Sequence, residues 1–181
     1  MSARFDYVQI MIVDDNNHMR TLVAEILRAI GVKDVCEAVD GADALQLMRH
    51  APPDIIITDF AMEPIDGVEF VRMVRTSSDS PCPIVPIIMM TGHSERSRVC
   101  EARDSGVTEF LSKPISARGV LERLVEVIEH PRPFVRTKSY FGPDRRRKMD
   151  KKYNGPMRRK TDEANQGAEA ETEDSKNAQQ N

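Results

Sequence analysis

The chain has 181 residues, 40% of them hydrophobic, and its net charge of −3 conceals a block pattern. Residues 1–130 carry 13 basic against 21 acidic side chains, residues 131–160 carry 12 against 2, and residues 161–181 carry 1 against 6. No run approaches the roughly 18 apolar residues of a membrane span and no secretory signal opens the chain, so we expect a cytoplasmic protein.

Five short apolar runs separated by helix-length segments indicate the buried strands of a parallel sheet. In chain order, the expected strands cover about residues 7–13, 33–38, 54–58, 84–90 and 107–112. The helices expected between and after them cover about residues 17–30, 41–50, 67–75, 94–104 and 116–130. Five such β/α repeats predict a single three-layer α/β domain.

The domain boundaries follow from where apolar residues become sparse. In the last expected helix, four apolar side chains are predicted to face inward: Leu121, Leu124, Val125 and Ile128. Pro131 and Pro133 are predicted to end the packed part, giving a domain over residues 5–130 and a basic extension over residues 131–160. Residues 161–181 contain no large apolar side chain and are expected to be disordered.

Four of the five runs end at a residue able to hold a phosphoryl group or its magnesium ion. The pair Asp14 and Asp15 follows the first run, Asp59 the third, Thr91 the fourth and Lys113 the fifth. Because the carboxyl ends of parallel strands share one edge of a sheet, these side chains are predicted to converge. Carboxylates suit Mg²⁺ and can attack phosphorus, while an ammonium and a hydroxyl stabilise the transferring oxygens.

Residues 5–130 resemble the CheY-like receiver domains of two-component response regulators. The resemblance rests on the acidic pair Asp14-Asp15, on Asp59 within TDFAMEPIDG, on Thr91 within MMTGHS and on Lys113-Pro114. It implies a flavodoxin-like, doubly wound sheet with strand order 2-1-3-4-5. It also implies that Asp59 receives its phosphoryl group from a phosphohistidine on a histidine kinase or a histidine phosphotransfer protein.

The same resemblance assigns a metal site and a switch. The implied Mg²⁺ ligands are Asp15, Asp59, Asp14 acting through water, and the backbone carbonyl of Ala61. Phe110 occupies the aromatic switch position and Thr91 is its partner, so phosphorylation would shift the population between two packings. The chain departs from the pattern at Pro64, which stands one residue later than usual and leaves Glu63 in its place.

The basic extension contains the frame Tyr-x-Gly-Pro-x-Arg-Arg twice, at residues 140–146 and 153–159. Three interpretations stay open: a solvated tail, a polyanion-binding or lipid-binding segment, and a guanine-nucleotide site. The candidate nucleotide-binding residues are Tyr140, Asp144, Arg145, Arg146, Arg147, Arg158 and Arg159. The extension resembles that of alphaproteobacterial single-domain regulators that bind cyclic di-GMP and contact the flagellar motor.

These features together predict a single-domain response regulator that controls motility or surface behaviour and catalyses only its own phosphorylation and dephosphorylation. The 51 residues after position 130 lack the apolar periodicity of a helix-turn-helix, so no DNA-binding domain is expected. The alternative is a phosphotransfer intermediate or phosphate sink whose tail is nonspecific. A phosphohydrolase of the haloacid dehalogenase type is disfavoured because Asp14-Asp15-Asn16 does not supply its DxD nucleophile.

Overall fold

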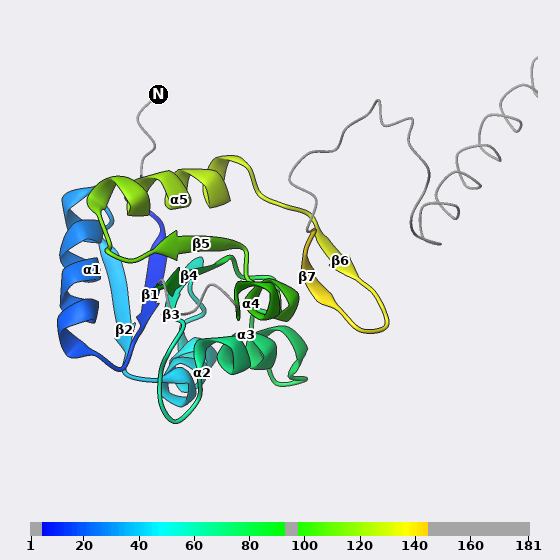
Figure 1. Cartoon of the computed structure of the whole chain (residues 1–181). Coiled ribbons are helices and arrows are strands. Elements are labelled where there is room, and N and C mark those ends of the chain that lie inside the picture. Colours follow the sequence, from blue (N-terminus) through cyan, green and yellow to red (C-terminus); the bar gives the residue numbers. More distant parts are fainter. Residues whose placement is uncertain (1–4, 93–97, 145–181) are drawn as a thin grey trace, which may run out of the picture. The chain divides into compact units, whose positions relative to one another are not determined.

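The computed structural model describes residues 5–92 and 98–144, and strands alternate with helices through most of it (Figure 1). The strands are β1 Gln9–Val13, β2 Asp34–Ala38, β3 Ile55–Asp59, β4 Ile87–Thr91 and β5 Glu109–Ser112. The helices are α1 Asn17–Ala29, α2 Gly41–His50, α3 Gly67–Thr76, α4 Val99–Ser105 and α5 Ala117–Glu129. None of these helices is long and apolar enough to cross a membrane.

The five strands form one parallel sheet in the order β2-β1-β3-β4-β5, which confirms the predicted flavodoxin-like fold. All five residues of β3 and all five of β4 are buried. Both strands lie inside the sheet, and helices cover both faces of the sheet. Because neither face of these strands meets water, their apolar residues do not alternate with polar ones. The continuous apolar runs seen in the sequence therefore report true central strands.

Helices α1 and α5 cover one face of the sheet, while α2, α3 and α4 lie on the other (Figure 1). Successive residues of a strand point to opposite faces. Ile10 and Ile12 of β1 accordingly join the core beneath α1 and α5, whereas Met11 and Val13 join the core on the opposite face. The two cores hold the strand ends in a common row, and that row positions the site described below.

The inward face of α5 differs from the predicted one. Val120, Leu124 and Val127 are the buried residues of this helix. Leu121 is 37% exposed and Ile128 is 40% exposed, so the prediction that both face inward is wrong. The helix covers one edge of the domain, where a narrow stripe spaced by three and four residues meets the core and the adjacent apolar positions lie on its flank.

The packed part of the chain does not end at Pro131 and Pro133. Two further strands, β6 (Phe134–Arg136) and β7 (Phe141–Pro143), pair antiparallel as a hairpin. The buried carboxylate of Glu109 on β5 lies against Arg132 just before that hairpin. The interpretation of this stretch as a solvated tail is therefore wrong up to residue 144, and residues 145–181 lie outside the described part.

Candidate functional site

The carboxyl ends of four strands place four of the predicted site residues along one edge of the sheet. Asp59 ends β3 and Thr91 ends β4, while Asp14 and Lys113 directly follow β1 and β5. The Lys113 Nζ lies 2.7 Å from the Asp59 Oδ1, and the Lys113 amide donates to the Thr91 carbonyl at 2.8 Å. We call Asp14, Asp59, Thr91 and Lys113 the Asp59 rim.

Asp14 is the most enclosed member of the rim, with only 1% of its surface exposed. The amide of Asn16 donates to its Oδ1 at 2.8 Å, and Arg20 Nη1 donates to its main-chain carbonyl at 2.7 Å. The Asn16 side chain also caps α1 by accepting from the amides of His18 and Met19. The first turn of α1 thereby holds the Asp14 carboxylate in place.

The rim concentrates negative charge away from water. The pKa of Asp14 is raised to about 6, mainly because the carboxyl is buried and also because of the nearby charges of Asp59 and Asp15; the Asn16 amide and the Lys113 ammonium act in the opposite direction. Asp14 Oδ2 is buried with no hydrogen-bond partner, and Asp59 Oδ1 meets Lys113 as a close ion pair without hydrogen-bond geometry. A cation at the rim would relieve this unfavourable charge.

The buried oxygens of Asp14 and Asp59 fit the oxygen-only, partly hydrated coordination that Mg²⁺ prefers. In the described residues, however, no three His, Cys, Asp or Glu side chains already stand together as a metal cage. Asp15, the third carboxylate expected at the metal site, does not join Asp14 and Asp59. Its side chain is exposed, and its Oδ2 accepts from the Glu63 amide at 3.2 Å. Ala61, the other implied ligand, lies exposed in the same loop after β3.

Gly67 is a site residue that sequence reasoning noted only as the start of a helix. Its amide donates to the Phe60 carbonyl at 2.9 Å, and Asp66 caps α3 by accepting from the Glu69 amide. A Cβ at position 67 would lie 2.1 Å from the Asp59 carbonyl oxygen. The end of β3 and the start of α3 therefore touch through backbone, a close approach that glycine permits.

Arg98 is a second residue near the rim that the sequence did not reveal. Its guanidinium lies over the Phe60 ring, 4.8 Å from the centroid, and pairs with Asp66 at 3.0 Å. An arginine beside α4 carries no sequence signal for this contact, because Phe60 and Asp66 become its neighbours only in the folded chain. Phe110, the predicted switch residue, is partly buried against the core on the α3 face.

Two of the candidate nucleotide-binding residues, Tyr140 and Asp144, lie within the part of the chain that the structure describes. Tyr140 lies in the turn of the hairpin, where its hydroxyl donates to the Pro143 carbonyl at 2.8 Å. Asp144 closes the base of the hairpin through its amide, which donates to the Pro133 carbonyl at 2.8 Å. The five candidate arginines, at positions 145–147, 158 and 159, lie outside the described residues.

The family model of the response regulator receiver domain matches residues 10–125 of the chain. The chain is 31% identical over 122 residues to the chemotaxis protein CheY of Pseudomonas aeruginosa, an alignment that covers 67% of this chain and 97% of that protein. It is equally similar to the chemotaxis protein CheY-3 of Vibrio cholerae, of which the alignment covers 92%.

Solved structures give the same result. The chemotaxis protein CheY4 of Vibrio cholerae superposes with a TM-score of 0.61 at 32% identity, covering 68% of this chain and 100% of CheY4. The receiver domain of NtrX from Brucella abortus superposes with a TM-score of 0.61 at 25% identity, covering 67% of this chain and 99% of that domain. Both matches leave about a third of this chain uncovered.

Proposed function

Because this chain belongs to the response regulator receiver domain family, we propose that it is phosphorylated on Asp59 by a phosphohistidine donor, a histidine kinase or a histidine phosphotransfer protein. The observation that carries the proposal is the 2.7 Å contact between the Lys113 Nζ and the Asp59 Oδ1 at the edge of a parallel sheet. A buried carboxylate beside a fixed ammonium is the arrangement that phosphoryl uptake by an aspartate requires.

The transfer needs little covalent chemistry from the protein. One carboxylate oxygen of Asp59 bonds to phosphorus as the phosphorus–nitrogen bond to the donor imidazole breaks, and the bonding pair stays with the ring nitrogen. The Lys113 ammonium offsets charge on the phosphoryl oxygens, and the Thr91 hydroxyl can donate to one of them. Asp15, Asp59, the Ala61 carbonyl and, through water, Asp14 would hold Mg²⁺, which would neutralise further charge on these oxygens.

A small phosphodonor tests this proposal without the cognate kinase. We expect acetyl phosphate with Mg²⁺ to add one phosphoryl group to the intact protein by mass spectrometry, and EDTA to prevent the addition. Borohydride reduction of the acyl phosphate should then convert position 59 to homoserine in the peptide map. A phosphoryl group that maps to another residue, or the absence of any addition, would contradict the proposal.

We also propose that the basic extension binds cyclic di-GMP and that this binding directs the output toward motility or surface behaviour, through the flagellar motor or another partner. The support is the repeated Tyr-x-Gly-Pro-x-Arg-Arg frame. Arginine pairs with guanine through both arms of its fork and also contacts phosphate. The first copy begins inside the β6–β7 hairpin, and in the sequence Arg145 stands two positions after the end of β7.

Calorimetric titration of cyclic di-GMP tests the second proposal. Arg145→Ala/Arg146→Ala is expected to weaken binding about 30-fold or more, since one bidentate arginine–guanine contact is worth about 1–3 kcal/mol. Lys151→Ala/Lys152→Ala removes the same charge from the same segment outside both copies, and it is expected to bind nearly as wild type does. No heat with the wild type at micromolar protein, or equal weakening by both pairs, would refute specific recognition.

A further inference from the structure

The β6–β7 hairpin is docked on the receiver through a buried arginine. Arg75, in the last turn of α3, is 2% exposed, and its guanidinium lies 5.0 Å from the centroid of Phe134 in β6. Its Nε donates to the Gly106 carbonyl at 3.1 Å and its Nη1 to the Pro83 carbonyl at 2.8 Å. Burial lowers the pKa of Arg75 to about 10, so it still carries its charge at neutral pH beneath the hairpin.

Gly106, the C-cap of α4, forms the other wall of this docking site. It adopts a φ of 107°, and a Cβ there would lie 3.1 Å from the Phe141 carbonyl oxygen. A Cβ on Gly142 of β7 would in turn lie 2.9 Å from the Gly106 Cα. The hairpin and the end of α4 thus meet backbone to backbone. A shift of only 0.5–1 Å here forfeits about a quarter to a half of the dispersion attraction.

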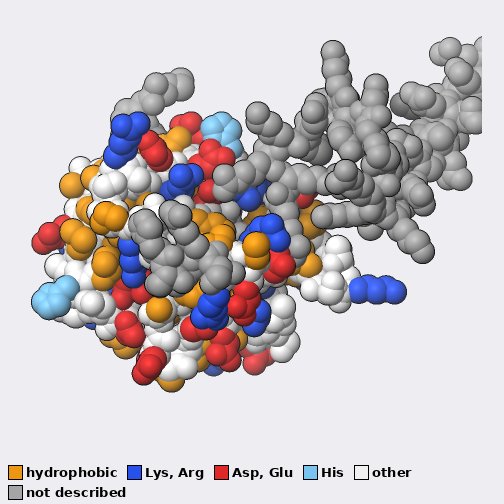
Figure 2. Space-filling view, in the orientation of Figure 1, with side chains coloured by type: hydrophobic (Ala, Val, Ile, Leu, Met, Phe, Trp, Pro, Cys, Tyr) orange, Lys and Arg blue, Asp and Glu red, His pale blue; other side chains and the backbone are white. Residues whose placement is uncertain are grey.

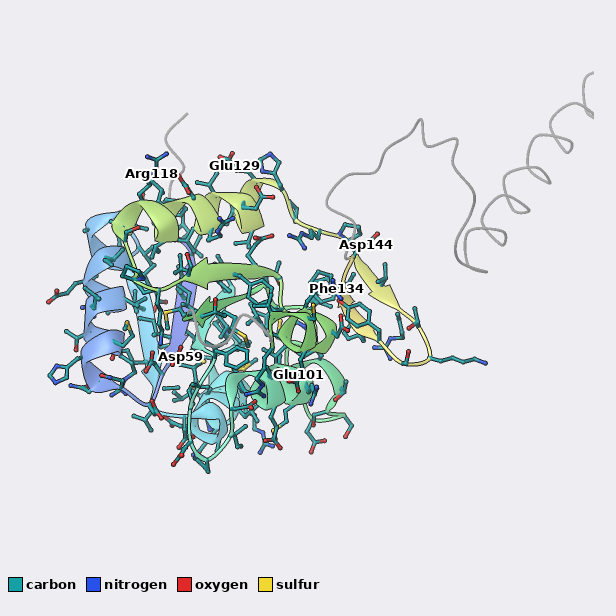
Figure 3. The ribbon with its side chains drawn as sticks, in the orientation of Figure 1. Asp59, Glu101, Arg118, Glu129, Phe134 and Asp144 are labelled. Carbon is teal, nitrogen blue, oxygen red and sulfur yellow. The ribbon has the colours of Figure 1, made fainter. Side chains whose placement is uncertain are left out.

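The opposite end of α4 contacts residues next to the Asp59 rim. Arg98, immediately before α4, stacks over Phe60, the residue after Asp59, and pairs with Asp66 at the start of α3. It also pairs with Glu101 in the first turn of α4 at 3.2 Å. Basic and acidic side chains accordingly lie together over α3 and α4 (Figure 2). In the view of Figure 3, α4 lies between Asp59 and Phe134.

We propose that α4 links the state of the Asp59 rim to the docking of the β6–β7 hairpin, with Arg98 as the positioning residue at one end and Gly106 at the other. The proposal rests on the proposed phosphorylation of Asp59. A phosphoryl group there adds negative charge beside Phe60. This charge attracts the Arg98 guanidinium, and the movement of Arg98 shifts α4. The close packing at Gly106 then loosens, and the hairpin with the basic segment behind it is released.

The magnitude of this link is bounded by its contacts. Arg98 is about half exposed, so solvent weakens its ion pairs and its cation–π contact, and each of them is a small contribution. Coupling free energies of about 1–3 kcal/mol, which correspond to roughly 5–150-fold, are typical of linked sites. Helix α4 has only seven residues and spans about 10 Å. Its two ends are therefore close together and do not fray independently, as the ends of a long helix can.

Hydrogen exchange measured by mass spectrometry tests the link on the full chain. The amides of Thr137 and Asp144 donate within the hairpin to the carbonyls of Tyr140 and Pro133. They report docking because an isolated two-stranded hairpin is only marginally stable in water and is expected to open once it leaves the receiver. With acetyl phosphate and Mg²⁺, we expect exchange in residues 134–144 to accelerate about fivefold or more. Intact mass on the same samples reports phosphorylation separately. Full phosphorylation with unchanged exchange would overturn the link alone, whereas no phosphorylation would overturn both proposals.

A matched pair of variants isolates Arg98. Arg98→Gln removes the contacts to Phe60, Asp66 and Glu101, whereas Arg72→Gln removes only a second arginine that pairs with the same Glu101 at 3.1 Å. We expect phosphorylated Arg98→Gln to show at most a twofold change in hairpin exchange, and phosphorylated Arg72→Gln to respond as the wild type does. An undiminished response in Arg98→Gln, or an equal loss in both variants, would contradict the assignment.

Discussion

The variant Asp59→Asn is expected to take up no phosphoryl group from acetyl phosphate or from a phosphohistidine donor. An amide oxygen is a poor nucleophile, and the neutral side chain removes one of the two buried carboxylates at the rim. Its nitrogen would also repel the Lys113 ammonium that now lies 2.7 Å from Asp59 Oδ1. Intact mass spectrometry after incubation with Mg²⁺ and donor gives a direct measurement.

The control for this variant lies directly before the same strand. Asp54 precedes β3 and accepts from the Gln9 amide at 2.9 Å, at the edge of the sheet opposite Asp59. Asp54→Asn is therefore expected to be phosphorylated like the wild type. Phosphorylation of Asp59→Asn at a comparable rate, or a comparable loss in Asp54→Asn, would move the acceptor away from the rim.

A loss of uptake in Asp59→Asn should reflect chemistry and not unfolding. Breaking the pair with Lys113 leaves an ammonium that is 30% exposed and can be hydrated, while removal of the Asp59 charge relieves repulsion on Asp14. These effects oppose one another, so we expect the free energy of unfolding to change by less than about 1 kcal/mol. Denaturant titration of both variants measures this.

The parts of the fold that could be predicted are those that depend on residues adjacent in the sequence. The central strands β3 and β4 are apolar runs, and the residues that end them, Asp59 and Thr91, fall on one edge because the strands are parallel. No long-range information is needed for that step. The arrangement of the rim follows from strand order and strand ends alone.

What could not be predicted depends on contacts between distant segments. Asp15 stands beside Asp14 in sequence, yet it turns to the Glu63 amide in a loop 48 residues away. The β6–β7 hairpin has strands of three residues, too short for an alternating pattern, and its anchor Arg75 looks like an ordinary polar residue at the end of an amphipathic helix. Burial of an arginine against a later segment leaves no local signal.

The variant Gly67→Ala is expected to be among the most destabilising single methyl additions in the domain. The new Cβ would lie 2.1 Å from the backbone oxygen of Asp59, and neither β3 nor α3 can yield by rotating a side chain. Overpacking of this kind costs about 3 kcal/mol or more when backbone must move, which would lower Tm by roughly 10 °C. Thermal unfolding followed by circular dichroism measures the change.

Gly41→Ala is a closely matched control, because Asp40-Gly41 begins α2 as Asp66-Gly67 begins α3. Around Gly41 the nearest atoms are side-chain carbons of Phe70 and Ile65 at 3.3–3.4 Å, which need to yield by only a few tenths of an ångström, so the expected change is within about 1 kcal/mol. Gly67→Ala should also slow phosphoryl uptake, since its strain acts on the Asp59 backbone itself. Equal Tm values for the two variants would show that this close approach is absent in solution, and with it the support that α3 gives to the Asp59 rim.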